Sequence, residues 1–564
     1  MANDSSVIRA LEKFIELEMA RAHLPGMAIA LTDRERLLWS STFGYSNLDA
    51  KIPVTPQTLF EIGSISKSFT SIVLLQLQEQ GLLYLDEPVT RYLPWFKVQS
   101  EHSPITLKHL MSHSAGIIRG MEFSGEARFE TWALRNTRAA APPGERYHYS
   151  NVGYKILNVV LEDVLCQSFG EIIQERILDP LGMPQTAPII TNDIRGQLAV
   201  GYEAFFDDRP MPANRPLAPA TWLEYRWGDG SVASTARDMA SYLRMFLNLG
   251  RVDGKTILSE TSMRRMMAPA IEAVEEGDGS AYGYGLGIYE QDSHTVIGHS
   301  GGMVGYYAQI MADRTDGFGV VVLTNGPGCR DDEIAKFALR LLRANKSGKP
   351  MPPMPAIDLT KVEDATAFAG TYTAAQNPLH MPGGTSQGPV TFTMIAEDQR
   401  LYLLYDGERI LLEPRGQDSF YVNHPDFAFF LLRFGREKDQ IVEAFHGPNW
   451  YPHERYRGPR QYNFPAEWTA YTGHYRSHNP WDTNFRVVLQ KGSLRLIYPS
   501  GEEHPLVQMG EGEFRVGKEQ RSPESIRFDI LLDGQAIRAN LSCGDYYRAY
   551  KASYKARCMD PNGD

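Results

Sequence analysis

Long apolar runs are absent from this sequence of 564 residues. Even the apolar region from Ile72 to Leu77 soon meets Gln78-Glu79-Gln80, whereas a membrane-spanning helix needs about 20 consecutive apolar residues. The first residues lead into an amphipathic run that starts at Val7, without the basic segment and apolar core of a signal peptide. We therefore expect a protein outside membranes and, for the chain in this form, in the cytoplasm. A signal peptide removed earlier would leave no trace here.

Cysteine is also scarce. The four cysteines are far apart and form no Cys-x-x-Cys pair, and none of them stands beside an activating histidine. Reactive thiols need such an environment. We expect buried, reduced thiols rather than disulfides or cysteine chemistry at Cys166, Cys329, Cys543 and Cys558.

Basic residues are outnumbered. The chain has 57 Lys and Arg against 68 Asp and Glu, a formal net charge of −11, and no basic cluster with interleaved aromatic residues offsets it. This charge opposes an extended surface for nucleic acid or anionic membranes. The expected partner is a small molecule or peptide. The sequence leaves open whether several copies form a homo-oligomer.

Clustered prolines mark a domain boundary. The segment from Asn345 to Ala356 holds four prolines, which forbid helix and favour an extended spacer. We predict a first domain over residues 1–345 and a linker over 346–360. The length of the chain allows about two to four domains.

The first domain mixes two hydrophobic periods. Helical patterns and strand-like runs with short turns together favour an antiparallel sheet with helices packed on it. The helical patterns cover residues 6–22, 64–80, 151–167, 234–248 and 330–344, and the strand-like runs cover 26–33, 36–43, 283–290, 304–312 and 318–324.

An internal repeat follows the linker. Phe368-Ala-Gly-Thr-Tyr372 is matched by Tyr471-Thr-Gly-His-Tyr475, and Leu401 to Tyr405 is matched by Leu494 to Tyr498. Both halves consist of short alternating strands, so we predict two β units of about a hundred residues each, a usual domain size. Closed antiparallel barrels would remove exposed strand edges. The predicted units cover 361–460 and 461–557, and residues 558–564 form a tail.

Ser64-Ile-Ser-Lys67 begins an apolar helical run. Residues three apart on a helix share a face, so the Lys67 amine can reach the Ser64 hydroxyl. A hydroxyl is a weak nucleophile until a neighbouring base takes its proton. Backbone N–H groups at a helix start also face negative charge that develops on a substrate. The spacing therefore predicts a nucleophile and its base.

Two further elements suit the same chemistry. Tyr149-Ser150-Asn151 stands on a turn before a helix, where the tyrosine could carry a proton and the asparagine could bind a carbonyl or amide. His299-Ser300-Gly301-Gly302 ends the strand-like run from Thr295 to Gly298. Gly301 and Gly302 would let a substrate backbone approach the strand edge, and the Gly302 N–H could be a second oxyanion donor.

Together the three elements resemble the penicillin-recognising serine hydrolases, nearest the branch with class C β-lactamases, D-aminopeptidases, D-alanyl-D-alanine carboxypeptidases and esterases of β-lactamase type. The resemblance covers roughly residues 7–340. It extends to Phe60-Glu-Ile-Gly-Ser64, Gly81-Leu-Leu-Tyr-Leu-Asp86, Tyr92-Leu-Pro94, Ile105-Thr-Leu-Lys-His-Leu110, His113-Ser-Ala-Gly116 and Pro180-Leu-Gly-Met183.

The resemblance implies an α/β (α+β) serine β-lactamase-like domain, followed by two all-β domains that are antiparallel, lipocalin-like barrels. It implies that Ser64 is acylated and that Lys67 and Tyr149 act as general base and acid. Asn151 would orient the substrate. His299 stands where β-lactam-specialised members often have lysine, which counts against recognition of a β-lactam carboxylate because a neutral imidazole holds an anion less well. No cofactor and no metal are implied.

The layout of one catalytic domain and two β units is similar to that of D-aminopeptidases. It points to a serine hydrolase that cleaves amide bonds of small peptides or amino-acid amides, while a carboxylesterase of β-lactamase type is the close rival. A covalent β-lactam-binding protein with slow turnover is an alternative of another class. In a further alternative, the hydrolase is degenerate and the β-rich half binds a ligand.

Two tempting patterns receive a structural interpretation. His109 and His113 have the i, i+4 spacing of a helical metal pair but lack the intervening glutamate and a third ligand. The stretch from Tyr282 to Gly287 has the glycine spacing of a nucleotide loop without the preceding strand and following helix. We interpret it as a strand with close packing.

Overall fold

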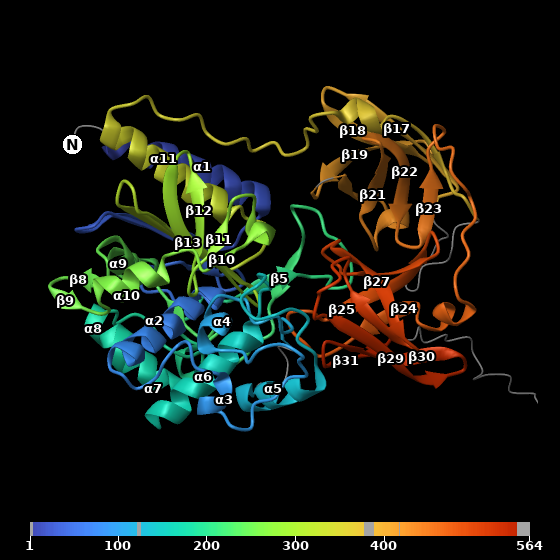
Figure 1. Ribbon diagram of the computed structural model, residues 1–564. Coiled ribbons are helices and arrows are strands. Elements are labelled where there is room, and N and C mark those ends of the chain that lie inside the picture. The colour runs from blue at the N-terminus through green and yellow to red at the C-terminus, as the bar shows by residue number, and fades with distance from the viewer. Residues whose placement is uncertain (1–3, 121–125, 377–388, 417, 550–564) are drawn as a thin grey trace, which may run out of the picture. The chain divides into compact units, whose positions relative to one another are not determined.

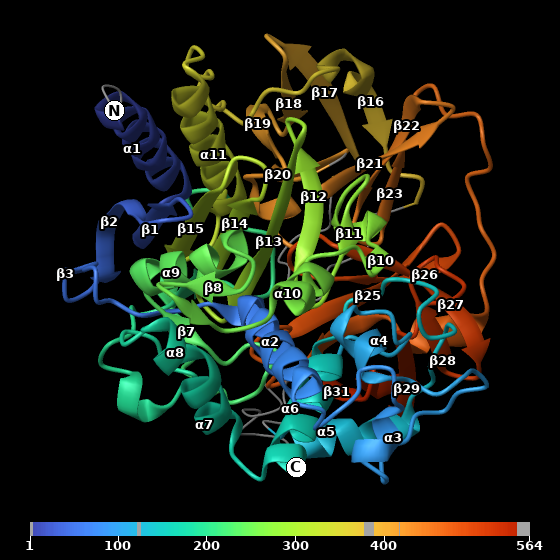
Figure 2. The same cartoon turned by 60° about the vertical axis from the view of Figure 1, so that its left-hand side comes forward.

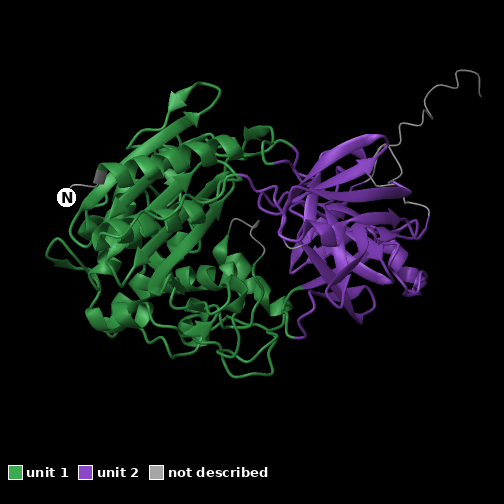
Figure 3. Cartoon of the chain, turned by 90° about the horizontal axis from the view of Figure 1, so that it is seen from above, with its two compact units in different colours: residues 1–205, 213–357, 521–524 green, residues 206–212, 358–520, 525–564 purple. Residues whose placement is uncertain are grey.

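The computed structural model describes residues 4–120, 126–376, 389–416 and 418–549. The chain divides into two compact units (Figure 3). The first unit comprises Met1–Phe205, Ala213–Ile357 and Arg521–Glu524, and the second comprises Phe206–Pro212, Asp358–Gln520 and Ser525–Asp564. The predicted tail and the last residues predicted for the second β unit lie outside the described residues.

The first unit is built on a nine-stranded antiparallel sheet. Strands from the two ends of its sequence meet in the middle, because β1 pairs with β15 from Met27 opposite Thr324 to Thr32 opposite Gly319. In spatial order the strands are β10 (Ile271–Glu272), β11 (Ala281–Tyr282), β12 (Gly287–Gln291), β13 (His294–Met303), β14 (Tyr306–Asp313), β15 (Phe318–Thr324), β1 (Gly26–Thr32), β2 (Leu37–Asn47) and β3 (Ile52–Pro53).

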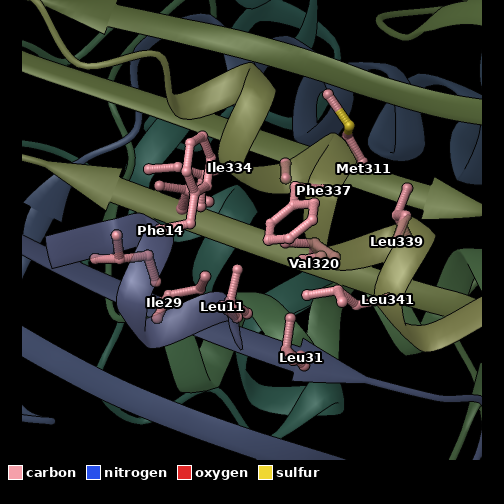
Figure 4. Close-up of a cluster of buried hydrophobic side chains, with 14 of the residues drawn as sticks. Leu11, Phe14, Ile29, Leu31, Met311, Val320, Ile334, Phe337, Leu339 and Leu341 are labelled. Carbon is pink, nitrogen blue, oxygen red and sulfur yellow. The ribbon is translucent and has the colours of Figure 1, made fainter. Parts of the chain in front are cut away.

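Two terminal helices of this unit, α1 (Asp4–Ala22) and α11 (Asp331–Ser347), cover one face of the sheet (Figures 1 and 2). Apolar residues three or four apart on α1 point to one side, as an amphipathic helix requires. Phe14 of α1 meets Phe337 of α11 edge to face, with ring centroids 5.3 Å apart (Figure 4). Each such fully buried side chain stabilises the fold by about 1.5–3 kcal/mol.

Helix α9 (Ala236–Leu247) covers the opposite face. The Thr235 hydroxyl caps its first turn by accepting from the Asp238 N–H at 3.2 Å. A Cβ on Gly319 of β15 would lie 3.1 Å from the Leu243 side chain of α9, whereas the neighbouring Val320 packs in the cluster with α1 and α11. Alternate residues of β15 thus face the two helical layers.

The remaining helices form a second layer around α2 (Ser66–Glu79), which follows a 3-10 turn (Gly63–Ile65). All residues of α2 from Ser66 to Leu77 are buried. The other elements of this layer are α3 (Val89–Tyr92), α4 (Leu107–Met111), α5 (Ala127–Ala133), α6 (Asn151–Leu165), α7 (Phe169–Ile173), a π-helix (Gln174–Leu178), α8 (Asp179–Leu181) and α10 (Glu260–Met266), with short strand pairs β4 (Phe60–Glu61) and β7 (Ala233–Ser234), β5 (Tyr202–Ala204) and β6 (Leu217–Pro219), and β8 (Arg251–Val252) and β9 (Lys255–Thr256).

Across the described ranges, no helix combines the length and apolar character that crossing a bilayer demands.

A buried ion pair joins α5 to α6. Lys155 Nζ donates to both carboxylate oxygens of Glu130, at 2.9 and 2.8 Å, and each side chain is 1% exposed. We expect Lys155→Met to lower the free energy of unfolding by about 3–5 kcal/mol, because the Glu130 carboxylate would stay buried without its lysine. Urea denaturation measures the loss.

The same two helices offer a matched control. Arg128 of α5 pairs with Asp163 of α6 at the surface, with 47% and 34% of the side chains exposed. Arg128→Ala should cost less than about 1 kcal/mol, since solvent screens exposed pairs. Equal losses in the two variants would contradict the buried-pair argument.

The second unit contains two antiparallel sheets of eight strands each. The first sheet runs in chain order, and a single bridge between Tyr372 and His453 links its two ends. The second sheet is a closed barrel, because β24 also pairs with β31. The first contains β16 (Gly370–Thr373), β17 (Thr391–Glu397), β18 (Arg400–Tyr405), β19 (Glu408–Pro414), β20 (Ser419–Val422), β21 (Leu432–Glu437), β22 (Gln440–His446) and β23 (Asn449–Pro452); the second contains β24 (Gly473–Arg476), β25 (Asn484–Gln490), β26 (Ser493–Ile497), β27 (Glu503–Gly510), β28 (Glu513–Val516), β29 (Ser525–Leu532), β30 (Gln535–Leu541) and β31 (Gly544–Arg548).

The repeated aromatic-x-Gly-x-Tyr motif has the same structure in both sheets. Each tyrosine is fully buried and its hydroxyl donates to the carbonyl four residues earlier: Tyr372 to Phe368 O and Tyr475 to Tyr471 O, both at 2.8 Å. A short 3-10 helix precedes each motif, η6 (Ala365–Phe368) and η8 (Ala466–Ala470). The predicted fold class, with two all-β parts after an α+β domain, is confirmed.

Three sequence interpretations need correction. The prediction of buried thiols is wrong for three cysteines, because Cys166 is exposed and Cys329 and Cys543 are partly exposed, although all three are free.

The strand predicted over residues 283–290 starts later, because residues 283–286 form the turn between β11 and β12 and the strand itself begins at Gly287. A Cβ on Gly285, where φ is +77°, would lie 3.0 Å from the Lys67 backbone oxygen, so a glycine turn packs here against α2. The histidine-glycine motif does not end a strand either, because β13 continues to Met303.

Candidate active site

Ser64 and Lys67 meet as the spacing predicted. Ser64 lies in the 3-10 turn before α2, and Lys67 lies in the first turn of α2. Lys67 Nζ donates to Ser64 Oγ at 2.9 Å and to the backbone oxygen of Asp229 at 2.9 Å. The residue is 0% exposed. An amine held within hydrogen-bond reach of a hydroxyl and shielded from water is the geometry of an activated serine nucleophile.

Aromatic rings surround the lysine amine. Lys67 Nζ lies 4.9 Å from the ring centroid of Tyr149 and 5.7 Å from that of Tyr154. The Tyr154 hydroxyl donates to Met111 O at 2.6 Å, and burial raises the pKa of Tyr154 far above its ordinary value. Tyr149 is the nearer of these two rings to the lysine amine, and it lies in the turn just before α6.

The turn that carries Tyr149 is fixed by its neighbour Ser150, the N-cap of α6. Ser150 Oγ accepts from the Gly153 N–H at 3.1 Å and donates to Ile118 O at 2.7 Å. The Ser150 N–H donates to His113 Nδ1 at 3.0 Å. Burial and the charge of Lys67 hold the pKa of His113 well below its usual value, so a neutral ring accepts this bond. Asn151, the first residue of α6, is buried next to this turn.

His109, the other histidine of the i, i+4 pair, also accepts a backbone hydrogen bond. His109 Nδ1 accepts from the backbone N–H of Thr106 at 3.1 Å, which closes a capping box at the start of α4. Both Nδ1 atoms thus accept backbone N–H groups. These bonds agree with the structural interpretation of this stretch.

His299 lies in β13 with both ring nitrogens engaged. Its Nδ1 bonds the Ser300 carbonyl oxygen, which can only accept, so Nδ1 carries the hydrogen. Its Nε2 then accepts from the Tyr282 hydroxyl at 2.8 Å. Burial, helped by the charge of Lys67, lowers the pKa of His299 to about 4. The imidazole is therefore neutral at pH 7 and offers no positive charge to a bound anion.

Glycines bring the β13 backbone against the serine turn. A Cβ on Gly301 would lie 1.9 Å from Ile62 O, and a Cβ on Gly63 would lie 2.6 Å from Gly302 O and 2.7 Å from Gly302 N. A Cβ on Gly302 would enter open space. The backbone of Gly302 thus runs directly beside the turn that holds Ser64, as two N–H groups of an oxyanion hole would require.

The fold gathers the predicted residues into one site. The rings of Tyr149 and His299 lie 6.3 Å apart between centroids, and the charge of Lys67 acts on His299. Sequence reasoning missed Tyr282, which fixes the His299 ring, and Asp229, whose carbonyl receives Lys67. No spacing rule could find either residue. Asp229 is 162 residues from Lys67 along the chain, and Tyr282 is 17 residues from His299.

Comparisons with known proteins relate the first unit to a known family. The family model described as Beta-lactamase matches residues 11–344. Protein flp of Staphylococcus aureus (strain N315) is 26% identical over 336 residues, which are 58% of this chain and 64% of that protein, so the chain spans less than two-thirds of this relative. Penicillin-binding protein 4* of Bacillus subtilis (strain 168) is 26% identical over 413 residues, 68% of this chain and 85% of that protein.

A solved structure extends the likeness beyond the first unit. The octameric penicillin-binding protein homologue from Pyrococcus abyssi is 27% identical, with a TM-score of 0.58. The superposition covers 79% of this chain and 99% of that one. The similarity thus reaches past the end of the matched family model, into the β-rich half.

Proposed function

Because the chain belongs to the Beta-lactamase family, we propose that it is a serine hydrolase that works through an acyl-enzyme on Ser64. The observation that carries this proposal is the 2.9 Å hydrogen bond between Lys67 Nζ and Ser64 Oγ in a fully buried environment. Serine needs a base at this distance, and few structural roles would bury a lysine amine against a serine hydroxyl.

The proposed reaction has two halves. The neutral Lys67 amine accepts the Ser64 proton while Oγ attacks the substrate carbonyl carbon, and the N–H groups of Ser64 and Gly302 stabilise the oxyanion. Tyr149 passes a proton to the leaving nitrogen or oxygen, the scissile bond breaks, and an ester to Ser64 remains. Water then attacks the ester with the same groups in reversed roles. Asn151 orients the substrate through its side-chain amide.

We further propose amide bonds of small peptides or amino-acid amides as substrates, as in a D-aminopeptidase. The neutral His299 supports this choice, because it offers no positive charge for a substrate carboxylate. The two all-β sheets that follow the hydrolase unit along the chain support it as well, through the resemblance to D-aminopeptidase architecture.

Carboxylesterase activity is the second candidate. It uses the same acyl-enzyme chemistry, and a neutral site suits an uncharged ester. A covalent β-lactam-binding protein with slow turnover is the candidate of another class. Two relatives carry penicillin-binding names, while the neutral His299 weighs against this candidate.

The oligomeric state is a separate question. The relative from Pyrococcus abyssi is described as octameric, which supports a homo-oligomer for this chain. One chain already holds Ser64, Lys67 and Tyr149 together, so the proposed chemistry requires no residue from a second copy.

A substrate panel tests the function. Purified protein is given D-alanine p-nitroanilide, L-alanine p-nitroanilide and p-nitrophenyl butyrate, with Ser64→Ala as the blank and a fluorescent penicillin as a label. We expect Ser64-dependent turnover with preference for the D-anilide. Turnover of the ester alone would replace the amidase proposal by the esterase, and stoichiometric labelling without turnover would favour the covalent binder. No Ser64-dependent reaction with any reagent would refute all three.

A further inference from the structure

The loop that receives Lys67 is held from three sides. The Gly228 N–H donates to Asn158 Oδ1 at 2.9 Å, and Thr70 Oγ1 donates to Gly228 O at 2.7 Å. The Val232 N–H donates to Ser66 Oγ at 3.0 Å. Between these contacts, Asp229 O accepts from Lys67 Nζ. The loop therefore gives the amine a fixed second partner opposite Ser64.

The carboxyl group of Asp229 is buried in the same place. Its Oδ2 accepts from the Tyr225 hydroxyl at 2.8 Å, and Oδ1 has no hydrogen-bond partner among the described residues. Burial raises the pKa of Asp229, while the charges of Lys155 and Lys67 and the bond from Tyr225 act in the opposite direction. A carboxyl group without a full set of hydrogen bonds is costly to bury, so its placement calls for an explanation.

The Lys155–Glu130 pair lies behind this carboxyl group. Both members of the pair act electrostatically on Asp229, Lys155 favouring its charged form and Glu130 opposing it. Lys155 is four residues after Asn151 on α6, so the helix directs both toward the same side. Lys67, Lys155 and Glu130 thus all act on the buried Asp229 carboxyl group.

The two histidines near Lys67 carry no charge near pH 7. His113 and His299 are neutral because burial lowers the pKa of each ring. The Tyr149 and Tyr154 rings face the amine from the α6 side, and burial raises the pKa of Tyr154. The charge of Lys67 in turn acts on the Asp229 carboxyl group and lowers its pKa.

We propose that Asp229 is a positioning residue for Lys67: its carbonyl fixes the amine against Ser64, and its carboxylate stabilises the ammonium form and so sets the pH at which the site loses its base. This inference rests on the proposed function. A carboxylate beside the ammonium favours the protonated lysine, so more alkaline conditions are needed to free the base.

The test is the pH profile of kcat/KM for whichever reagent of the panel the wild-type chain turns over. Asp229→Asn keeps the backbone carbonyl and removes the charge. We expect the acid limb to move to lower pH by about one unit, which is about a tenfold gain in relative activity well below the original limb. A merely structural role would lower activity by one factor at every pH.

Asp238→Asn is the matched control. Asp238 is also a buried carboxyl group in this unit, but its pKa is set by burial and by the hydrogen bonds that it accepts from the Gln185 N–H and from Thr186 Oγ1. Its acid limb should stay in place. A shift of equal size in Asp238→Asn would overturn the inference, because it would show a general response to the loss of a buried charge.

Tyr225→Phe keeps the inference testable if Asp229→Asn does not fold. It removes the hydrogen bond that favours the charged carboxylate, so the acid limb should move in the same direction by a smaller amount. An unmoved limb in the folded variants refutes the role of Asp229. Absence of Ser64-dependent turnover in the wild-type chain would instead refute the proposed function, so the two failures are distinguishable.

Discussion

Replacing Ser64 by alanine is expected to lower kcat by about five to six orders of magnitude on every reagent that the chain turns over. Only the hydroxyl oxygen is removed, and the variant loses one hydrogen bond, to Lys67 Nζ. The free energy of unfolding should therefore change by no more than about 1–2 kcal/mol. Initial rates and urea denaturation measure the two effects on the same preparation.

Mass spectrometry makes the Ser64 test specific. A slowly released substrate should add its acyl group to the wild-type chain and leave Ser64→Ala unmodified. Ser66→Ala is the matched control, because Ser66 lies in the next turn with its hydroxyl directed at the Val232 N–H. It should still be acylated. Acylation of Ser64→Ala, or a rate near that of the wild type, would refute the mechanism.

Replacing Lys67 by alanine is expected to lower kcat by about three to four orders of magnitude, with a much smaller change in KM. The amine is the group within 2.9 Å of Ser64 Oγ, while substrate contacts are assigned to other residues. Steady-state kinetics on the best reagent of the panel measures the split between kcat and KM.

Rescue by a small amine separates a missing base from a distorted site. Lys67→Ala leaves a buried space beside the Tyr149 and Tyr154 rings. Added methylamine or ethylamine could occupy this space, and we expect it to restore part of the rate in a concentration-dependent way. The same amines should not restore Ser64→Ala. Failure of rescue together with a lower melting temperature would indicate that Lys67 acts through packing alone.

The sequence predicted the contact between Ser64 and Lys67, the two residues that we propose react, because this contact is local. Ser64 and Lys67 are three residues apart, and the helical turn between them brings their side chains to the same face. The family resemblance along residues 7–340 is confirmed by the match to the Beta-lactamase family model. The internal repeat could also be predicted from the sequence, because its structural basis is local. Tyr372 and Tyr475 are buried, and each makes the same hydrogen bond within its own segment.

Contacts between residues on different strands and helices had no signal in the sequence. The Tyr282 hydroxyl reaches His299 only because β11, β12 and β13 are neighbours in the sheet. The run from residue 283 to 290 predicted a continuous strand, yet Gly285 lies in a turn whose positive φ and contact with α2 depend on the packed structure. Sequence alone gives a motif, and packing decides which side chain completes it.

The sequence by itself therefore determined the family, the order of an α+β part and two β parts, and the serine with its lysine, because these follow from local periodicity and short spacings. Only the tertiary structure decided that His299 is neutral and that Asp229 lies against Lys67, since both depend on burial and on partners distant along the chain. Burial removes water from these groups, and the cost of charge in that environment then sets what each one can do.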